Sequence, residues 1–180
     1  GWAGSFAVND IGNRLSSANL DVLRQWLRDP HAMSGHLPLQ EMPALRGVAD
    51  YYYDWLAHPT YDDYWKSFAP KEKFKQIKVP ALNWGGWYDG FIRGSIRCYQ
   101  GMRDKGESEL SRKQQHLIIG PWLHGPSPPA VSGQGYFGSD GSGDAIDLHG
   151  MQLSWFDHWL KGEDNGVDTD PNTYIFMMGE

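Results

Sequence analysis

The chain has 180 residues, of which 40% are hydrophobic and 21% are charged, so it can bury an apolar core and is not a disordered tail. Its net charge of −6, without a basic tract, argues against binding to nucleic acid or to an anionic membrane, because both need a cationic face. No run approaches the roughly 20 apolar residues of a membrane span, and the single cysteine excludes an internal disulfide framework and a cysteine-based zinc site.

Helical patterns dominate the first 70 residues. Residues 17–29 and 43–58 carry apolar side chains at helical spacing, and each segment is bordered by a proline. A third, short helix is expected from Thr60, with Asp63 three positions later in a capping box. Because these segments carry aromatic residues on several sides, we expect residues 1–70 to form a helical cap, or lid, that lies over another surface.

After residue 70 the pattern alternates between short apolar strands and amphipathic helices. In chain order we expect a strand at 78–84, a helix at 91–102, a strand at 115–119, a long loop at 121–143 and a helix at 146–160. This alternation predicts an α/β fold with a parallel sheet and flanking helices. In such sheets the chemistry lies in loops beyond the carboxyl ends of the strands, which here are residues 85–90 and 120–125.

Each of these two loops carries one side chain of a catalytic type. Asp89 lies in GGWYDG and His124 in GPWLHG. A carboxylate that meets an imidazole fixes its tautomer, and the imidazole can then take a proton from a serine hydroxyl. Asp before His is also the chain order of the Ser–Asp–His triad in α/β-hydrolases. The pattern leaves two simpler explanations open, namely an Asx-turn at Asp89 and an exposed His124.

The nucleophile has no candidate in this sequence. No serine stands in the G-x-S-x-G pattern of a nucleophile elbow. If the chain belongs to a serine hydrolase, we therefore expect the serine to lie upstream of Gly1.

The two loops and their flanking residues resemble a known group of α/β-hydrolases. VPALNWGGWYDGF, followed 35 residues after Asp89 by His124 in LIIGPWLHG, resembles the X-Pro dipeptidyl-peptidase, cocaine esterase and α-amino-acid ester hydrolase group. HPTYDDYWKSFAP and FDHWLKGEDNGV extend the resemblance on both sides. It covers residues 55–180 well and residues 1–54 loosely.

The resemblance implies an organisation into three parts. Residues 1–70 would be the helical cap, residues 71–165 the C-terminal half of the α/β-hydrolase core, and residues 166–180 a linker and the first strand of a truncated β-sandwich (jelly-roll) domain. The chain would then be an internal fragment that lacks the nucleophile half, and by itself it is expected to be inactive and poorly soluble.

The resemblance also implies roles for individual residues. Asp89 matches the triad acid, His124 the triad base, and Phe91 a position that lines the acyl pocket. Trp87 and Trp122 flank the two loops and are candidates for the substrate pocket, with core packing as the alternative. No metal or organic cofactor is expected.

We therefore expect a serine hydrolase that cleaves ester or amide bonds through an acyl-enzyme. Small acyl esters, aminoacyl esters, β-lactam side-chain amides and X-Pro peptides all remain candidate substrates. The alternatives are a non-catalytic, aromatic-rich ligand-binding module and an inactive truncated hydrolase. Nucleic acid and membrane are not expected partners, whereas a homo-oligomer and the compartment (cytoplasmic, periplasmic or secreted) stay open.

Three further features have simpler explanations. Residues 139–144 lack the alternating ligands and the terminal glutamate of a calcium loop. His31 and His36 have no acidic or cysteine partner at ligand spacing. Cys98 is expected to be a small buried hydrophobe. The sequence thus predicts no metal site.

Overall fold

The computed structural model describes residues 21, 24–25, 28–29, 31, 35–42, 45–124, 131–132 and 135–179. The chain forms two compact units, residues 1–68 and 69–180. This division lies two residues from the predicted boundary at residue 70, while the assignment of the first unit as a cap stays a prediction. None of the helices in the described ranges is long and apolar enough to cross a membrane.

The elements of the first unit that the structure describes from end to end are η1 (Leu39–Glu41), α4 (Tyr51–Ala57) and α5 (Asp63–Phe68). The helix predicted at 43–58 was too long. Gly47 has a left-handed backbone with φ of 67°, and its N–H donates to the Asp50 carboxylate, so the helix starts only after this turn.

The start of α5 also differs from the prediction. The Tyr64 N–H donates to the Asp62 carboxylate, so Asp62 caps this helix and Thr60 does not. The helix predicted at 17–29 lies mostly outside the described residues.

Three parallel strands form the core of the second unit, in the order β1 (Ala81–Gly86), β2 (Gln115–Gly120) and β5 (Thr173–Ile175). All six residues of the central strand β2 are buried. β1 pairs with β2 from Ala81 opposite Gln115 to Gly86 opposite Gly120. Because these two strands are parallel and in register, they end at the same edge of the sheet and the loops that follow start side by side.

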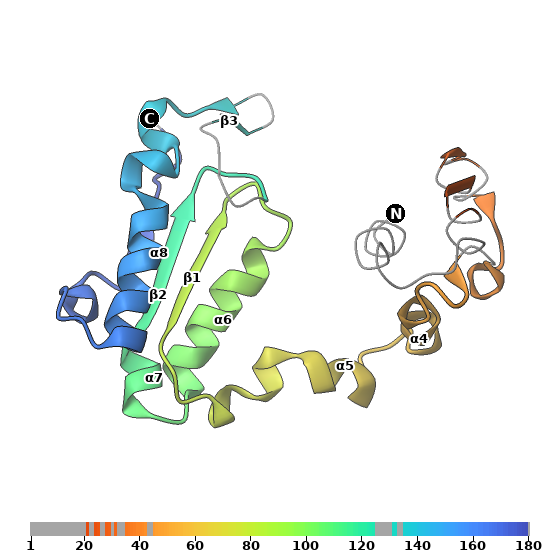
Figure 1. Ribbon diagram of the computed structural model, residues 1–180, viewed down its shortest axis with the longest axis horizontal. Helices are drawn as coiled ribbons and strands as arrows, with labels where there is room; N and C mark the ends of the chain where they lie inside the picture. The colour runs from red at the N-terminus through yellow and green to blue at the C-terminus, as the bar shows by residue number, and fades with distance from the viewer. Residues whose placement is uncertain are drawn as a thin grey trace. The chain divides into compact units, whose positions relative to one another are not determined.

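Helices α6 (Ile92–Lys105) and α8 (Leu148–Phe156) cover opposite faces of the sheet (Figure 1). Alternate residues of β2 point to the two faces. Leu117 and Ile119 pack with Tyr99 of α6, whereas Ile118 packs with Leu148 of α8. The α/β fold with a parallel sheet is thus confirmed. The strands of the parallel sheet are separated by helices, so this sheet does not show the short-strand pattern of the binding-module alternative.

The remaining elements are short and connect these parts. In chain order they are η3 (Pro70–Glu72), η4 (Phe74–Gln76), α7 (Glu109–Lys113), β3 (Val131–Ser132), β4 (Gly135–Tyr136), η5 (Ser139–Gly141), η6 (Asp144–Ile146), the π-helical turn η7 (Asp157–Lys161) and η8 (Val167–Thr169). β3 and β4 are antiparallel.

The helix predicted at 146–160 starts two residues later, at Leu148 of α8, and continues through η7. Gly162, with a left-handed φ of 76°, ends it.

Strand β5 joins the parallel sheet. Its residues Thr173–Ile175 pair with Leu117–Ile119 of β2. The sequence placed this segment at the entry to a β jelly roll, and the described residues show it only as the third strand of the α/β sheet. The jelly roll stays a prediction.

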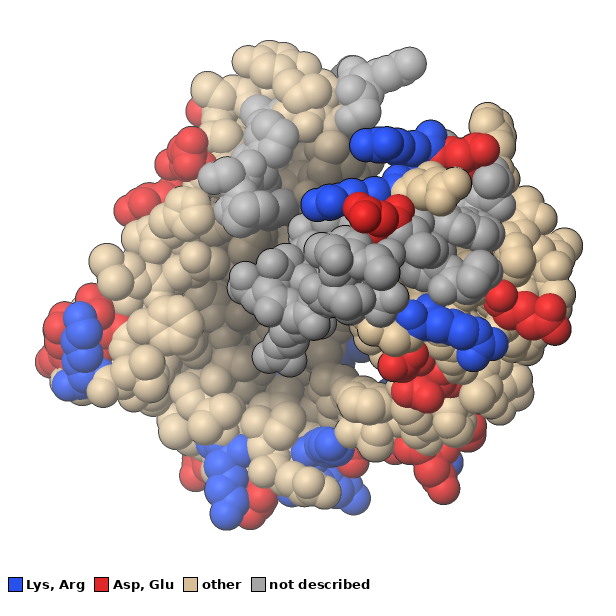
Figure 2. Space-filling view, turned by 45° about the vertical axis from the view of Figure 1, so that its right-hand side comes forward, with Lys and Arg blue, Asp and Glu red and all other residues tan. Residues whose placement is uncertain are grey.

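The charged side chains are mixed in sign. On the face shown in Figure 2, lysine and arginine side chains lie among aspartate and glutamate side chains and uncharged residues. This agrees with the net charge of −6, and the exclusion of nucleic acid as a partner remains a prediction.

Candidate active site

Hydrogen bonds to the end of β2 fix the path of the loop after β1. The Trp87 N–H donates to the Gly120 carbonyl at 2.9 Å, and the Tyr88 N–H donates to the Trp122 carbonyl at 3.0 Å. The two loops are therefore joined through their backbones. These hydrogen bonds fix the positions of the backbone segments that lead to Asp89 and His124.

Glycine is required where the two loops approach each other. A Cβ atom at Gly86 would lie 2.0 Å from the carbonyl oxygen of Trp122, and a Cβ atom at Gly120 would lie 2.0 Å from its indole ring. Any side chain at either position would push the loops apart. The glycines that end both strands are thus explained by close packing of backbone and ring.

The loops bring Asp89 and His124 together. Asp89 Oδ2 and His124 Nδ1 are 3.0 Å apart, and Asp89 Oδ1 accepts the Phe91 N–H at 2.8 Å. Asp89 thus forms an Asx-turn and binds the imidazole at the same time, and the His124 side chain is 70% exposed, so both simpler features left open by the sequence coexist with the pair. Because Nδ1 faces the carboxylate, Nε2 is the nitrogen that can exchange a proton with a substrate or nucleophile. We refer to Asp89 and His124 as the dyad.

The surroundings keep Asp89 ionised. Only 10% of its side chain is exposed, against 70% for His124. Partial burial acts to raise the pKa of Asp89, but the Phe91 N–H and the His124 ring more than offset this effect. The net result is a pKa below the ordinary value of an aspartate, which suits a group that must orient and stabilise an imidazolium at neutral pH.

A hollow of about 590 Å³ lies beside the dyad. Its walls are Trp84, Gly85, Asp89, Phe91, Ser95, Leu123 and His124. The Phe91 ring meets the His124 ring edge to face, with 5.2 Å between centroids. Phe91 therefore lies where a group held by the hollow would touch it, as expected of a pocket residue, although its role in an acyl pocket stays a prediction.

The two other predicted pocket residues have different contacts. Trp122 is only 2% exposed, and its indole N–H donates to the Gly141 carbonyl at 2.7 Å beneath the loop. The Trp87 indole N–H donates to the Phe176 carbonyl at 3.0 Å, which ties the Asp89 loop to the segment after β5. Neither residue is among those that line the hollow. Contact of Trp87 and Trp122 with the substrate therefore stays a prediction, and their positions do not support it.

The sequence favoured core packing over a pocket role for Trp84, and it did not single out two other residues that line the hollow, Leu123 and Ser95. Leu123 immediately precedes His124, and Ser95 lies one helical turn after Phe91, so adjacency and the i, i+4 spacing were available signals.

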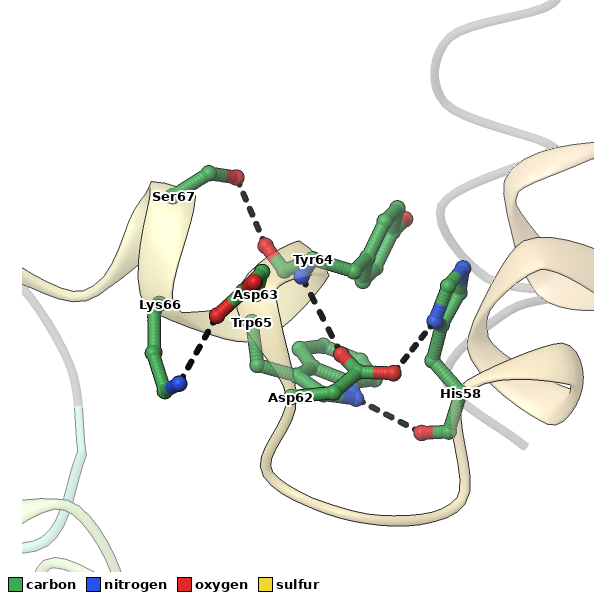
Figure 3. A network of polar contacts seen from close by, with 7 residues as sticks. All are labelled: His58, Asp62, Asp63, Tyr64, Trp65, Lys66 and Ser67. Carbon is green, nitrogen blue, oxygen red and sulfur yellow. Dashed lines mark hydrogen bonds and ion pairs between the residues drawn. The ribbon is translucent and has the colours of Figure 1, made fainter.

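A second imidazole–carboxylate pair lies in the first unit (Figure 3). His58 Nδ1 and Asp62 Oδ2 are 2.6 Å apart, and the His58 ring stacks on Tyr64 at 4.3 Å between centroids. The Trp65 indole N–H donates to the His58 carbonyl at 2.6 Å. The hydrogen bond from His58 holds the pKa of Asp62 below its ordinary value. All these contacts fall within eight residues and fix the turn between α4 and α5, so a local structural role accounts for the pair.

Neither a metal site nor a reactive thiol is indicated. Within the described ranges, no group of three or more His, Cys, Asp or Glu side chains is placed to hold a metal ion. Cys98 is partly buried, and this burial raises the pKa of its thiol, so little of it is thiolate at neutral pH.

Residues 5–126 match the family described as X-Pro dipeptidyl-peptidase (S15 family), in a segment that ends two residues after His124. The chain belongs to the S15 family. The resemblance inferred from the two loop motifs is thereby confirmed.

Two relatives illustrate the extent of the match. This S15-family chain is 26% identical over 185 residues to the cocaine esterase of Rhodococcus sp. (strain MB1 Bresler), covering 99% of this chain and 31% of the esterase. Among solved structures, it resembles an aminopeptidase from a marine sediment archaeon, Thaumarchaeota archaeon, with a TM-score of 0.58, 25% identity and coverage of 75% of this chain and 22% of the aminopeptidase. The chain thus spans about a third of the length of the curated relative.

Proposed function

We propose that this chain is part of a serine hydrolase that cleaves ester or amide bonds through an acyl-enzyme. The observation that carries the proposal is the dyad, in which Asp89 and His124 lie 3.0 Å apart at the ends of adjacent parallel strands. Membership of the S15 family supports the same reaction class.

In this proposal His124 is the general base and Asp89 its orienting acid. Asp89 accepts the Nδ1–H of His124 and so presents the unprotonated Nε2. Nε2 takes the proton of a serine hydroxyl as its oxygen attacks the acyl carbon, and the imidazolium then gives that proton to the leaving alcohol or amine. Water repeats the sequence to release the acid and regenerate the serine.

The nucleophilic serine comes from a part of the protein outside this sequence. The curated relative is about three times as long as the region that it shares with this chain, which leaves room for such a segment. The hollow beside the dyad would receive the serine together with the acyl group of the substrate.

The substrate class follows from the walls of the hollow and from the relatives. Trp84, Phe91 and Leu123 are apolar, so they suit an aliphatic or aromatic acyl group. The named relatives include an esterase and an aminopeptidase, and the proposed substrates are accordingly small esters, amides or short peptides. No metal ion or organic cofactor is part of the proposed reaction.

The test uses the complete protein and a serine-directed fluorophosphonate probe with an aryl ester substrate. The wild-type protein should be labelled on a single serine and should release the aryl alcohol, whereas His124→Ala should lose both activities because no base activates the serine. His149→Ala, on an exposed position of α8, is the matched control and should behave as wild type. Unchanged labelling and hydrolysis in His124→Ala would remove His124 from the reaction.

A further inference from the structure

Ser95 carries a free hydroxyl beside the dyad. It lies in the first turns of α6, and its side chain lines the same hollow as Asp89 and His124. Within the part of the chain that the structure describes, its hydroxyl forms no hydrogen bond. Ser95 is half-buried, and its Oγ is not among the fully buried polar atoms without a partner, so the hydroxyl is reachable from the hollow.

The usual internal partner of a helical serine is already engaged. Such a hydroxyl often bonds to the carbonyl four residues earlier, which in α6 is that of Phe91. The Phe91 carbonyl accepts the Gly94 N–H at 2.7 Å and the Ser95 N–H at 3.4 Å, and the Ser95 hydroxyl does not join them. The hydroxyl therefore stays available to a group outside the helix.

Gly85 keeps Ser95 open to the hollow. A Cβ atom at Gly85 would lie 3.5 Å from Ser95 Oγ and 3.1 Å from Ile92 Cδ1. Any larger side chain at this position of β1 would cover the hydroxyl. The glycine thus leaves a path between Ser95 Oγ and whatever the hollow holds.

The other polar side chains of the hollow have assigned partners. Both oxygens of Asp89 accept hydrogen bonds, one from the Phe91 N–H and one from His124. The free nitrogen of His124 faces the nucleophile in the proposed reaction. Of the remaining walls, Gly85, Phe91 and Leu123 have no polar side-chain atom, and Trp84 can only donate through its indole N–H, so Ser95 Oγ is the uncommitted group of the described lining that can both donate and accept.

We propose that Ser95 determines specificity by hydrogen bonding to a neutral polar group, a hydroxyl or a carbonyl oxygen, on the acyl part of the substrate. This inference rests on the proposed function and adds a preference within it. An acyl group that carries the matching oxygen gains a hydrogen bond, whereas one that lacks it leaves the Ser95 hydroxyl desolvated and unpaired.

The experiment compares matched pairs of p-nitrophenyl esters in the complete protein. One pair is phenylacetate and mandelate, and the other is 3-phenylpropanoate and 3-hydroxy-3-phenylpropanoate, so each pair differs by one hydroxyl. The readout is the ratio of kcat/KM for the hydroxylated ester to kcat/KM for its parent. We expect wild type to favour the hydroxylated ester in at least one pair and Ser95→Ala to reduce that ratio roughly 3- to 10-fold, as loss of one neutral hydrogen bond predicts.

Two further variants separate a specific contact from a structural effect. Ser95→Thr keeps a hydroxyl and should retain the preference, while Ser154→Ala, a half-buried serine on α8 outside the hollow, should leave the ratio at its wild-type value. A ratio that stays the same in Ser95→Ala, or an equal loss on both members of a pair, overturns the inference. If hydrolysis in that experiment still depends on His124, the proposed function stands; if the wild type hydrolyses none of the esters, both fall.

Discussion

Replacing Asp89 with asparagine alters a single atom of the dyad, and the hydrogen bonds around it determine the outcome. Asp89 Oδ1 accepts the Phe91 N–H at 2.8 Å, so the amide oxygen of asparagine must take that place because an NH₂ group there would face another donor. The NH₂ group is then directed at His124 Nδ1, where the carboxylate stood at 3.0 Å. Nδ1 must become the acceptor, and the proton moves to Nε2, which can no longer take a proton from the nucleophile.

The expected loss is large because the wrong tautomer disables the base. In serine peptidases with a Ser–His–Asp triad, the equivalent change lowers turnover about 10⁴-fold, or about 5.4 kcal/mol of activation free energy. Asp89→Asn should therefore lower kcat by about that factor in the complete protein. The loss should not exceed that of His124→Ala, which removes the base itself.

The assay is steady-state hydrolysis of an aryl ester, with thermal unfolding to verify the fold. Asp62→Asn is the matched control, since Asp62 also binds a histidine Nδ1 through Oδ2 and the N–H two residues on through Oδ1. The control should keep its activity because the second pair contributes to a local turn and not to the proposed reaction. Near wild-type kcat in Asp89→Asn, with the fold intact, would refute the assignment of Asp89 as the triad acid.

Two predictions concern the pocket wall and a buried histidine. Phe91→Ala removes a half-exposed wall of the hollow, so the preference among acyl groups of different size should shift by about 10- to 200-fold in kcat/KM, and an unchanged substrate profile would exclude Phe91 from the pocket. His116 is 4% exposed, and burial lowers its pKa below the ordinary 6.5 although Asp170 acts in the opposite direction. Between the two pKa values, the unfolded chain therefore binds more protons than the folded chain. The contribution of His116 to the free energy of unfolding is present above about pH 6.5, and it should be lost as the pH falls through the lower folded-state pKa. His116→Gln should flatten the dependence of the thermal midpoint on pH in this range. The control His149→Gln, at an exposed position, should leave that dependence unchanged. Equal slopes in His116→Gln and in the wild type would contradict the reasoning.

The sequence predicts the core of the second unit well because its signals are strong there. β2 is buried on both faces, and its apolar run Leu117–Ile119 is typical of an inner parallel strand. Glycines end both strands, and the side chains of catalytic type come three and four residues after them, in the loops that parallel strands bring together. The dyad could be predicted because Asp89 and His124 depend on this topology and not on finer packing.

Shorter elements were missed because two or three side chains decide them. Helix α7 has only five residues and is set by Ser108 and Ser111, whose side chains each accept the other's backbone N–H. The helix predicted at 43–58 was too long because the apolar spacing outweighed Gly47, whose left-handed backbone ends the pattern. Periodicity over a window does not register such single positions.

Sequence patterns also do not predict the direction of a side chain just beyond the end of a strand. Trp84 is still within β1, so its direction follows the pleat, and it both packs on Trp122 and lines the hollow. Trp122 follows β2 by two residues, and a bend of the loop places its ring in the core. Strand alternation no longer holds after the strand ends, and the two tryptophans could not be told apart from their spacing.

The order of the strands in the sheet governs when each part can form as the chain leaves the ribosome. β2 ends at Gly120, and its second neighbour β5 ends at Ile175, 55 residues later. At a synthesis rate of about 5–20 residues per second, this interval lasts about 3–11 s. The dyad needs only β1 and β2, so it can assemble before β5 exists. During those seconds one edge of the fully buried strand β2 has no partner, and a nascent-chain chaperone would find its target there.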